Sequence, residues 1–389
     1  MAMKKLADLD VHGKTVVIRQ DLNVPMKNGA VSNDKRIRAA LPTIRMALDK
    51  GAGVILLSHL GRPTEGEFDE QFSLKPVAAH LGDLLGKPVS VAKDLAAAKV
   101  VPGQCLILEN IRFFKGEKKN DPDFAAKLAA LGDVYVMDAF GTAHRAQAST
   151  EGAVRKAPVA CAGPLMVAEL DAFAKVLEKP ARPLVAMIGG SKVSTKLGVL
   201  QNLLARVDKL IVGGGIANTF LAATGVKVGK SLCENDMLED AKKIIEAARA
   251  QGKSLPLPLD VVTARELAPG QKATVHDVND VPEDEMILDI GPKTVELYEK
   301  ELADAATVVW NGPVGAFETE PFGAGTKALA EALAKCPAFV VVGGGDSVAA
   351  VEMYQLADKM GYISTGGGAS LELLEGKELP AVAALNARG

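Results

Sequence analysis

Cysteine and aromatic residues are scarce in this sequence of 389 residues. There are 4 cysteines and 1 tryptophan, and the aromatic fraction is 4%. The cysteines are too far apart for a zinc-binding or redox motif, and such sparse thiols are typical of a reducing compartment. We therefore expect a cytoplasmic protein whose cysteines are small core residues: Cys105, Cys161, Cys233 and Cys336.

Neither sign of charge dominates the sequence. The 45 Lys and Arg residues nearly balance the 48 Asp and Glu residues, which gives a formal net charge of -3. General nucleic-acid binding requires a clustered basic surface, so we expect no nucleic-acid partner.

Long hydrophobic runs are also missing. The most apolar stretch, residues 210–226, contains a glycine triplet together with Asn218 and Thr219, so we expect no membrane span. The first ten residues, from Met1 to Asp10, carry acids where a secretory signal peptide needs an apolar segment. A hydrophobic fraction of 48% nevertheless allows sizeable cores, so a disordered chain is not expected.

Glycine, by contrast, is abundant and unevenly placed. The 38 glycines show no G-X-Y period, which excludes collagen, and many gather in clusters in or next to the C-terminal half. Most arginines fall before residue 160 instead. Two lobes that bind anions differently would explain this asymmetry, one through guanidinium groups and one through backbone amides. At this point, arginines on a plain solvated surface remain the alternative.

The order of the elements predicts an α/β fold. Short β-branched runs alternate with amphipathic segments, such as the one with Ile37, Leu41 and Ile44 on one face. The alternation predicts doubly wound parallel sheets with helices on both faces, and the length predicts two or three domains. The expected strands are Thr15–Ile18, Val54–Leu57, Leu106–Leu108, Val134–Met137, Leu184–Ile188, Leu210–Val212, Met286–Leu288, Thr307–Val309 and Phe339–Val342.

A helix that ends in a proline-containing segment marks the best domain boundary. Met166, Phe173 and Leu177 define one face of this helix, and the prolines of residues 178–183 must end it. We expect the helix to join two lobes as a hinge element.

Charged and polar residues follow the expected strands of the first half where each strand ends. The carboxyl ends of parallel strands meet at one edge of a sheet, where ligands bind. The side chains at this edge would suit a small, highly anionic ligand. Taken singly, the acids and amides could be turn or cap residues, and the histidines could be structural. The residues are Asp21, Asn23, Arg36, His59, Arg62, Arg112, His144 and Arg145.

Glycine-rich turns follow the expected strands of the second half. Glycines at strand-to-helix turns let backbone N–H groups approach phosphate oxygens, and the helix dipole favours the negative charge. Lys192 and Lys196 are four positions apart, so on a helix they would share one face. Together the turns predict a nucleotide site, although glycines that merely allow tight turns are the alternative. The turns begin at Gly189, Gly213, Asn311, Gly343 and Thr365.

Two standard nucleotide-binding fingerprints are absent. Residues 225–231 resemble a Walker A loop, but the two glycines are one residue too close together. The glycine triplets also miss the G-x-G-x-x-G pattern, since the sixth position is Asn218 in one and Val348 in the other. Neither a P-loop enzyme nor a dinucleotide dehydrogenase is favoured.

Seven long motifs in the chain resemble those of the phosphoglycerate kinases. They occur in the family's order, and together they span nearly the whole chain, from residue 15 to residue 376. The motifs are residues 21–25, 58–63, 108–113, 138–145, 189–196, 310–315 and 364–370.

This resemblance implies a layout and a reaction. It implies two Rossmann-like lobes that face a cleft: a phosphoglycerate-binding lobe over residues 1–164 and a nucleotide-binding lobe over 181–370. A linker helix over 165–180 would join them as a hinge, and residues 371–389 would return to the first lobe. The family transfers the acyl phosphate of 1,3-bisphosphoglycerate to Mg-ADP, giving 3-phosphoglycerate and ATP, a step of glycolysis and gluconeogenesis. A monomer is also implied.

The resemblance further implies roles for the residues that match its motifs. Phosphoglycerate would be held by Asp21, Leu22, Asn23, Arg36, His59, Leu60, Gly61, Arg62, Arg112 and Arg145. The nucleotide would be held by Lys196, Gly213, Gly214, Asn311, Pro313, Glu318, Gly344, Gly345, Asp346 and Ser347, and Asp346 would also meet the Mg²⁺ that the nucleotide carries.

The chemistry of the reaction limits what the protein must supply. In the direction of ATP consumption, the nucleophile is a carboxylate that is ionised at neutral pH, so no general base is required. The remaining task is alignment and stabilisation of charge on the transferring phosphoryl group. We assign this task to Arg36, Lys192, Gly344 and Gly367. The reactive atoms are expected to meet only on hinge closure, which would exclude water.

Two alternatives and two departures accompany this interpretation. A two-lobed protein could close on an anion without catalysis, and a dehydrogenase is a second alternative. Gln147 stands where many family members have His, and Gly361-Tyr362 stands where many have Ser-His. None of these positions carries an assigned role, so only fine substrate affinity depends on them.

Overall fold

The computed structural model describes residues 3–389, which divide into two compact units. The first unit reaches to Asp171 and resumes at Glu378, and the second comprises Ala172–Lys377. The change from one to the other falls within helix α5 (Pro164–Leu177). Residues 1 and 2 of the N-terminal stretch considered for a signal peptide lie outside the described part.

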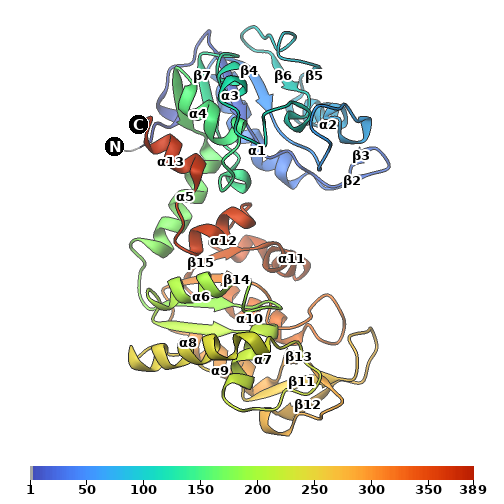
Figure 1. The fold of residues 1–389 in the computed structure, drawn as a ribbon, viewed down its shortest axis with the longest axis vertical. Helices are drawn as coiled ribbons and strands as arrows, with labels where there is room; N and C mark the ends of the chain where they lie inside the picture. The colour runs from blue at the N-terminus through green and yellow to red at the C-terminus, as the bar shows by residue number, and fades with distance from the viewer. Residues whose placement is uncertain (1–2) are drawn as a thin grey trace. The chain divides into compact units, whose positions relative to one another are not determined.

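The first unit is built on a six-stranded parallel sheet (Figure 1). The strand order is β5 (Val89–Ala92), β6 (Cys105–Leu108), β4 (Gly53–Leu57), β1 (Thr15–Arg19), β7 (Val134–Met137) and β8 (Val159–Ala162). Its helices are α1 (Lys35–Asp49), α2 (Lys75–Leu85), α3 (Pro122–Ala129), α4 (Ala153–Lys156) and α13 (Pro380–Asn386). A small antiparallel pair, β2 (Met26–Lys27) and β3 (Ala30–Val31), precedes α1.

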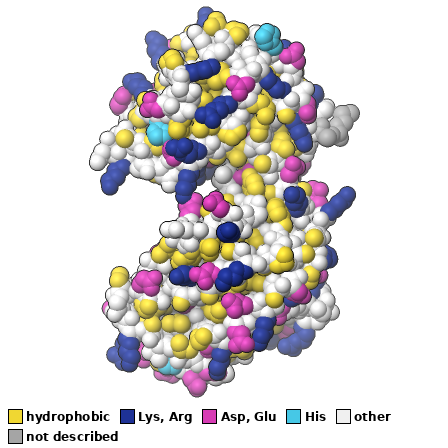
Figure 2. Space-filling view, turned by 180° about the vertical axis from the view of Figure 1, so that it is seen from behind, with side chains coloured by type: hydrophobic (Ala, Val, Ile, Leu, Met, Phe, Trp, Pro, Cys, Tyr) yellow, Lys and Arg dark blue, Asp and Glu magenta, His cyan; other side chains and the backbone are white. Residues whose placement is uncertain are grey.

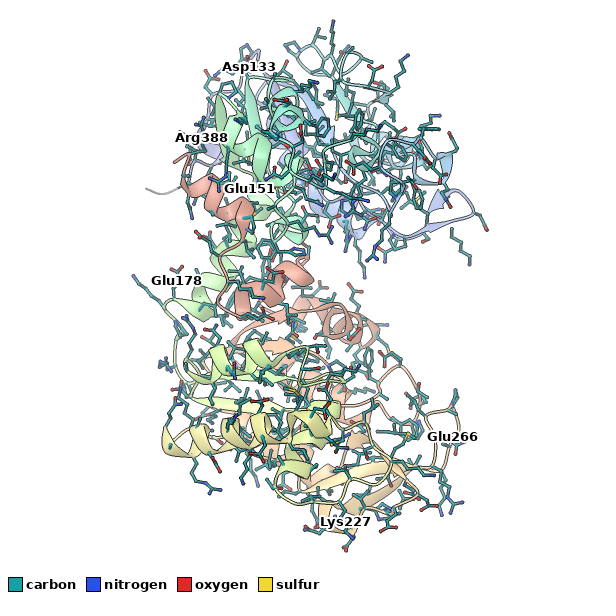
Figure 3. The ribbon with its side chains drawn as sticks, viewed as in Figure 1. Asp133, Glu151, Glu178, Lys227, Glu266 and Arg388 are labelled. Atoms are coloured by element: carbon teal, nitrogen blue, oxygen red, sulfur yellow. The ribbon has the colours of Figure 1, made fainter. Side chains whose placement is uncertain are left out.

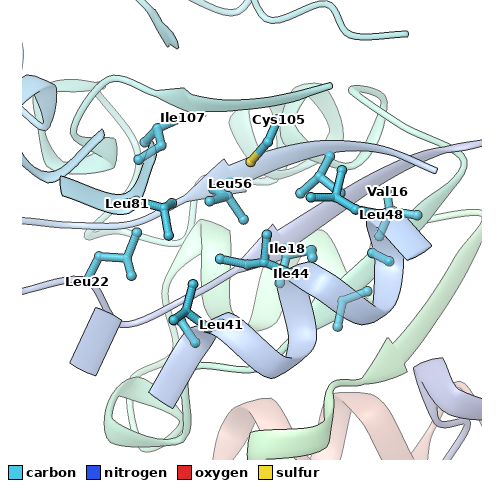
Figure 4. Close-up of a cluster of buried hydrophobic side chains, with 14 of the residues drawn as sticks. Val16, Ile18, Leu22, Leu41, Ile44, Leu48, Leu56, Leu81, Cys105 and Ile107 are labelled. Atoms are coloured by element: carbon cyan, nitrogen blue, oxygen red, sulfur yellow. The ribbon is translucent and has the colours of Figure 1, made fainter. Parts of the chain in front are cut away.

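Apolar side chains of α1 form much of the core of this unit. The expected helical face is present, because Ile37, Leu41 and Ile44 are all buried. They lie in one cluster with Ile18 of β1 and Leu56 of β4 (Figure 4). Burial of each such side chain contributes about 1.5–3 kcal/mol. This packing fixes the orientation of the sheet edge at which β1 and β4 end.

The second unit contains a five-stranded parallel sheet. The strand order is β10 (Lys209–Val212), β9 (Leu184–Ile188), β14 (Thr307–Asn311), β15 (Phe339–Gly343) and β16 (Tyr362–Ile363). Its helices are α6 (Leu197–Leu204), α7 (Gly214–Ala223), α8 (Leu238–Ala250), α9 (Pro292–Leu302), α10 (Ala324–Lys335), α11 (Gly345–Met353) and α12 (Gly368–Leu374). The fold class predicted from the sequence, α/β with two doubly wound parallel sheets, is confirmed.

One expected strand belongs to a different sheet. The sequence predicts a parallel strand starting at Met286, but this run forms the edge of a separate three-stranded sheet in the second unit. That sheet has the order β12 (Thr274–Asp277), β11 (Asp260–Ala264) and β13 (Met286–Ile290), and its pairs are antiparallel. The prediction was wrong because β11, which pairs with β13, and β12, which pairs with β11, were not recognised as strands.

The end of the chain returns to the first unit as α13 (Figure 1). The backbone N–H of Ala381 donates to the carbonyl of Ala143 at 3.1 Å, and the guanidinium of Arg388 donates to the carbonyl of Ala157 at 2.6 Å (Figure 3). The return begins at Glu378, later than the expected residue 371. Residues 371–377 stay with the second unit because α12 packs on α6, where Asn202 donates to the carbonyl of Leu374 at 2.7 Å.

The surface carries both signs of charge. On the face shown in Figure 2, Lys and Arg side chains are interspersed with Asp and Glu side chains. Within residues 3–389, we find no helix that is both long enough and apolar enough to cross a membrane.

Candidate active site

The strand ends of the first unit lie side by side, as expected from the sequence. The central order β6-β4-β1-β7 is parallel throughout, so the segments after these strands meet at one edge of the sheet. These segments carry most of the residues predicted to hold an anion, and Arg36 joins them from the first turn of α1.

A chain of hydrogen bonds links three of these segments. Nη1 of Arg36 lies 3.4 Å from the carboxylate of Asp21 and donates to the carbonyl of Asn23 at 2.8 Å. Oδ1 of Asn23 accepts from the backbone N–H of Gly61 at 2.9 Å, and the Gly61 carbonyl accepts from Arg112 at 2.5 Å. Asp21 and Asn23 therefore serve as turn residues and also orient two arginines.

Arg19 also belongs to this edge, although it is not among the residues predicted from the sequence. It is the last residue of β1 and is fully buried, with Nε donating to Oγ of Ser149 at 2.8 Å. Its Nη2 lies 3.3 Å from Nδ1 of His59. The signal in the sequence was an arginine at the end of an otherwise apolar strand, a position where a charge needs a specific partner.

A buried acid, Glu117, is linked to Arg19 through Ser149. Glu117 accepts from the backbone N–H of Ser149 at 2.9 Å and from its hydroxyl at 2.5 Å. Burial lowers the pKa of Arg19 and raises the pKa of Glu117, and the charge of each group opposes the shift of the other. The pair keeps a guanidinium in the interior next to the anion edge.

The local potential at this edge is strongly positive. Burial, followed by the charges of Arg19 and other arginines, holds the pKa of His59 well below its usual range, so its imidazole is neutral at neutral pH. Burial and the neighbouring Arg145 lower the pKa of Arg112 to about 10. Buried Nη1 of Arg145 has no hydrogen-bond partner among the described residues. An anion placed here would relieve this repulsion and satisfy the free donor.

The other predicted residues of this edge have different settings. The side chains of Leu22 and Leu60 are buried, so they pack in the interior and only their backbone is available to a ligand. Arg62 is exposed, and His144 is half-buried in the same segment as Arg145.

In the second unit, glycines allow neighbouring turns to interlock. A β-carbon on Gly189 would overlap the carbonyl of Pro313, and one on Gly214 would lie 2.8 Å from the carbonyl oxygen of Gly190. Gly214 also has φ +63°, a conformation that favours glycine. These glycines therefore do allow tight turns, as the alternative interpretation expected. The same backbone geometry also exposes N–H groups to a ligand.

Lys196 lies at the centre of these turns. Its Nζ donates to the carbonyls of Gly189 at 2.6 Å and Asn311 at 3.0 Å. Burial lowers the pKa of Lys196 to about 8, against the opposing charge of Asp346. The expectation that Lys192 and Lys196 share a helical face is wrong, because α6 begins only at Leu197 and the preceding residues form a turn. Lys192 is exposed, whereas Lys196 is mostly buried.

A pocket of about 400 Å³ opens beside these turns. One wall is formed by the turns after β9, β10 and β14, and the other by strands β11 and β13 of the antiparallel sheet. The mixture of apolar walls and backbone polar groups is typical of a small-molecule site. Its lining includes Ser191, Gly214, Gly215, Lys230, Leu232, Val261, Leu267, Leu288, Pro313 and Asp346.

Two helices begin next to these turns. Gly344 precedes α11 and Gly367 precedes α12, so the free N–H groups of both helices lie at this edge of the sheet. Gly345 and Asp346 are exposed in the first turn of α11, but the hydroxyl of Ser347 is buried and accepts from the N–H of Gly312 at 2.5 Å. The Ser347 side chain is thus committed to joining two turns.

The structure gives different settings to the remaining predicted nucleotide residues. Asn311 is buried and donates through Nδ2 to the carbonyl of Gly343 at 3.0 Å, which joins the ends of β14 and β15. Glu318 is exposed on the segment that follows Pro313. Gly213 directly precedes α7, and its β-carbon position is occupied by Val314.

The residues present fit a metal ion that arrives with a nucleotide. In residues 3–389 there is no cluster of three or more His, Cys, Asp or Glu side chains that could hold a metal alone. Mg²⁺ binds through one or two carboxylates together with substrate phosphates and water, and the exposed carboxylate of Asp346 offers such a ligand near Lys196.

The sequence as a whole matches one family model. The model described as phosphoglycerate kinase matches residues 6–377. The chain belongs to the phosphoglycerate kinase family. The recognition made from the motifs is thus confirmed, and the chain is a kinase, a phosphotransferase of glycolysis, that acts on phosphoglycerate and ADP or ATP.

Individual relatives agree with this assignment. The chain is 72% identical over 388 residues to a phosphoglycerate kinase of Desulfovibrio desulfuricans and 59% identical over 389 residues to one of Nitratidesulfovibrio vulgaris, with 99–100% of every chain covered. The solved phosphoglycerate kinase of Coxiella burnetii has a TM-score of 0.96 at 53% identity over the full length of both chains. That of Pyrococcus horikoshii has a TM-score of 0.84 at 34% identity over 99% of both. A binding protein without catalysis and a dehydrogenase are not favoured.

Proposed function

We propose that the chain transfers the acyl phosphate of 1,3-bisphosphoglycerate to Mg-ADP, reversibly, with the first unit holding phosphoglycerate and the second the nucleotide. The observation that carries this assignment is the arginine-rich edge of the first sheet, where buried Nη1 of Arg145 has no hydrogen-bond partner within residues 3–389. A carboxylate-and-phosphate ligand offers the acceptors that this edge needs.

Phosphoglycerate would be held at this edge mainly by guanidinium groups. Arg112 and Arg145 would donate to the phosphate of 3-phosphoglycerate, at the end opposite the reacting carboxyl group. Arg62 and the neutral imidazole of His59 would lie alongside. Arg36, held toward Asp21 and Asn23, would meet the end of the molecule that carries the reacting carboxyl group. Leu22, Leu60 and Gly61 would shape the edge through their backbone.

The nucleotide would occupy the pocket of the second unit. Its base would lie against Gly213, Gly214 and Pro313, and its phosphates would meet the ammonium of Lys196 and the N–H groups at Gly344 and Gly345. Asp346 would hold the Mg²⁺ that comes with the phosphates, which partly neutralises their charge. Glu318 would bind the ribose hydroxyls, and Asn311 and Ser347 would maintain the turns around the site.

Catalysis would consist of alignment and charge stabilisation. The carboxylate of 3-phosphoglycerate is already ionised, so no residue needs to accept a proton. Arg36, Lys192 and the N–H groups at Gly344 and Gly367 would stabilise the charge on the transferring phosphoryl oxygens.

We also propose that the chain acts as a cytoplasmic monomer. Its four cysteines are all free thiols, which suits a reducing compartment. Light scattering of the purified protein tests the oligomeric state, and a dimer mass would refute that part of the proposal.

A coupled assay tests the reaction and the unit assignment together. Purified protein with ADP, Mg²⁺ and 1,3-bisphosphoglycerate should form ATP. Arg145→Ala should raise the KM for 3-phosphoglycerate about ten- to one-hundredfold, the effect of losing 1.5–3 kcal/mol from a charged hydrogen bond, and leave the KM for ATP unchanged.

Arg155→Ala is the matched control. Arg155 is exposed and pairs only with Glu151 at 2.8 Å among the described contacts, so both KM values should stay the same. Tight binding of both ligands without ATP formation would refute the proposed reaction. A rise confined to the KM for ATP in Arg145→Ala would reverse the two units.

A further inference from the structure

Glu234 holds the turn that carries Lys192. One carboxylate oxygen of Glu234 accepts from the backbone N–H of Ser194 at 2.9 Å, and the other accepts from the Ser194 hydroxyl at 2.5 Å. One side chain from a distant segment thus binds both the backbone and the side chain of Ser194, two positions after Lys192.

The segment around Glu234 is itself fixed to α7. The backbone N–H of Glu234 donates to Oγ1 of Thr219 at 3.1 Å, and Oγ1 of Thr219 donates to the carbonyl of Gly215 at 3.0 Å. Nδ2 of Asn218 donates to the carbonyl of Leu232 at 3.2 Å. Because Gly215 and Leu232 line the nucleotide pocket, the anchor of Glu234 and the wall of the pocket are parts of one structure.

The charge of Glu234 also suits this position. Partial burial would raise the pKa of Glu234, but the hydrogen bonds from Ser194 and the charge of Lys192 hold it below its usual range. Glu234 is therefore ionised at neutral pH.

Lys196 is held in a different way. Its ammonium is fixed by the carbonyls of Gly189 and Asn311, neither of which contacts Glu234 through any described hydrogen bond. Loss of Glu234 would thus loosen the backbone that carries Lys192 while leaving the ammonium of Lys196 in place. The two lysines of one motif have separate supports.

We propose that Glu234 is a positioning residue for Lys192, acting through its two hydrogen bonds to Ser194. This inference rests on the proposed function, in which Lys192 acts on the transferring phosphoryl group and Lys196 binds the nucleotide. Misplacement of a group that acts only in the transition state lowers kcat, whereas KM follows the groups that bind the ground state.

Glu234→Ala is the direct test. We expect kcat to fall about tenfold, because a small misplacement of an aligned group is costly in rate. The KM for Mg-ATP and the KM for 3-phosphoglycerate should change less than twofold. An unchanged kcat, or a loss carried by the KM for Mg-ATP, would overturn the proposal.

Asp236→Asn is the matched control. Asp236 is an exposed acid two positions further along the same segment, so its substitution removes the same charge without touching the turn at Ser194. Its kcat should equal that of the unaltered protein. An equal fall in both variants would show that net charge alone sets the rate, which would also overturn the proposal.

Two further variants separate positioning from stability. Glu234→Gln keeps one acceptor oxygen and should recover part of the lost kcat, and Ser194→Ala combined with Glu234→Ala should be no slower than Glu234→Ala alone. The thermal midpoint should stay within about 2 °C in all of them, as expected for a partly exposed pair. Additive losses in the double variant would refute the link through Ser194.

ATP formation by the unaltered protein distinguishes a failure of the proposed function from a failure of the role of Glu234. If the unaltered protein forms no ATP in the coupled assay, the proposed function fails. The kcat comparison is then replaced by a measurement of nucleotide affinity, which should be equal in all variants. If it forms ATP and Glu234→Ala does so equally fast, only the role of Glu234 fails.

Discussion

Lys196 is a buried cation whose hydrogen-bond partners are both neutral. Its ammonium donates to two backbone carbonyls, and Asp346, whose charge raises the pKa of Lys196, is exposed. Burial is the dominant effect and lowers its pKa to about 8. A phosphate anion would supply the missing negative charge, so binding should restore the ammonium form.

We therefore predict that the affinity for the nucleotide falls as the pH rises above about 8. Above about pH 8 the free protein loses the Lys196 proton, and binding must regain it, so the Kd for ADP should rise toward tenfold per pH unit. Below that pH the group is already charged and adds no dependence. Calorimetric titration with ADP between pH 7 and pH 9.5 measures this effect.

Lys196→Gln is the control for that titration. It should bind ADP more weakly at pH 7 and show no further loss from this group at higher pH. If the Kd of the unaltered protein stays constant up to pH 9.5, the role of Lys196 in phosphate binding is contradicted.

At the level of elements, the interlocked turns of the second unit require glycine for two separable reasons. Gly214 combines a positive φ with a close approach to the carbonyl of Gly190. Gly252, after α8, has a nearly identical φ of +65° but no atom within 4 Å of its β-carbon position. Comparison of the two isolates the close approach from the backbone strain.

Gly214→Ala should therefore cost more than Gly252→Ala. The left-handed conformation alone costs about 1–2 kcal/mol in either variant, and the contact with Gly190 should add about 1–3 kcal/mol in the first. Gly214→Ala should also raise the KM for Mg-ATP, because this turn lines the pocket. Chemical denaturation and steady-state kinetics measure both, and equal stability losses would contradict the interlocking account.

Several strands that are continuous apolar runs could be predicted from sequence, whereas strands interrupted by polar residues were missed. Leu184–Ile188 and Val134–Met137 are continuous apolar runs, typical of parallel strands, and both are strands with those bounds. Thr274–Asp277 alternates between half-buried and exposed residues and contains His and Asp, so it gives no such signal. The antiparallel sheet was not predicted because β12 and its neighbour β11, which contains Asp260 and Thr263, both lack a continuous apolar run.

For the site, the sequence indicated which residues come together but not how each is used. Parallel strands bring their ends to one edge, which is why Asp21, His59 and Arg112 could be predicted as neighbours. The commitment of Ser347 to Gly312 and the bond from Ser149 to Glu117 depend on side-chain orientation. No periodicity in the sequence specifies such orientations.

At the level of the whole molecule, the first unit is completed by the last residues of the chain. Leu379, Ala381 and Leu385 of this segment are buried, and α13 packs against α4 and β8. The bond from Ala381 reaches the carbonyl of Ala143, two residues before Arg145. The C-terminal helix therefore supports the segment that carries a predicted phosphoglycerate ligand.

Truncation after Lys377 should impair the two units unequally. Loss of two buried leucines removes about 3–6 kcal/mol of stabilisation from the first unit. The KM for 3-phosphoglycerate should rise, while the Kd for ADP stays within twofold because residues 172–377 remain intact. Calorimetry and kinetics measure both, and equal losses for the two ligands would contradict the division of the binding sites.

The late return of the chain also sets an order for synthesis. A ribosome makes the first unit's earlier segment before residues 172–377, yet α13, which completes that unit, comes after them. The nucleotide unit, from 172 to 377, has its full sequence available earlier. During translation, the unit that starts first is therefore completed after the other, because α13 can dock only once residues 172–377 have been made.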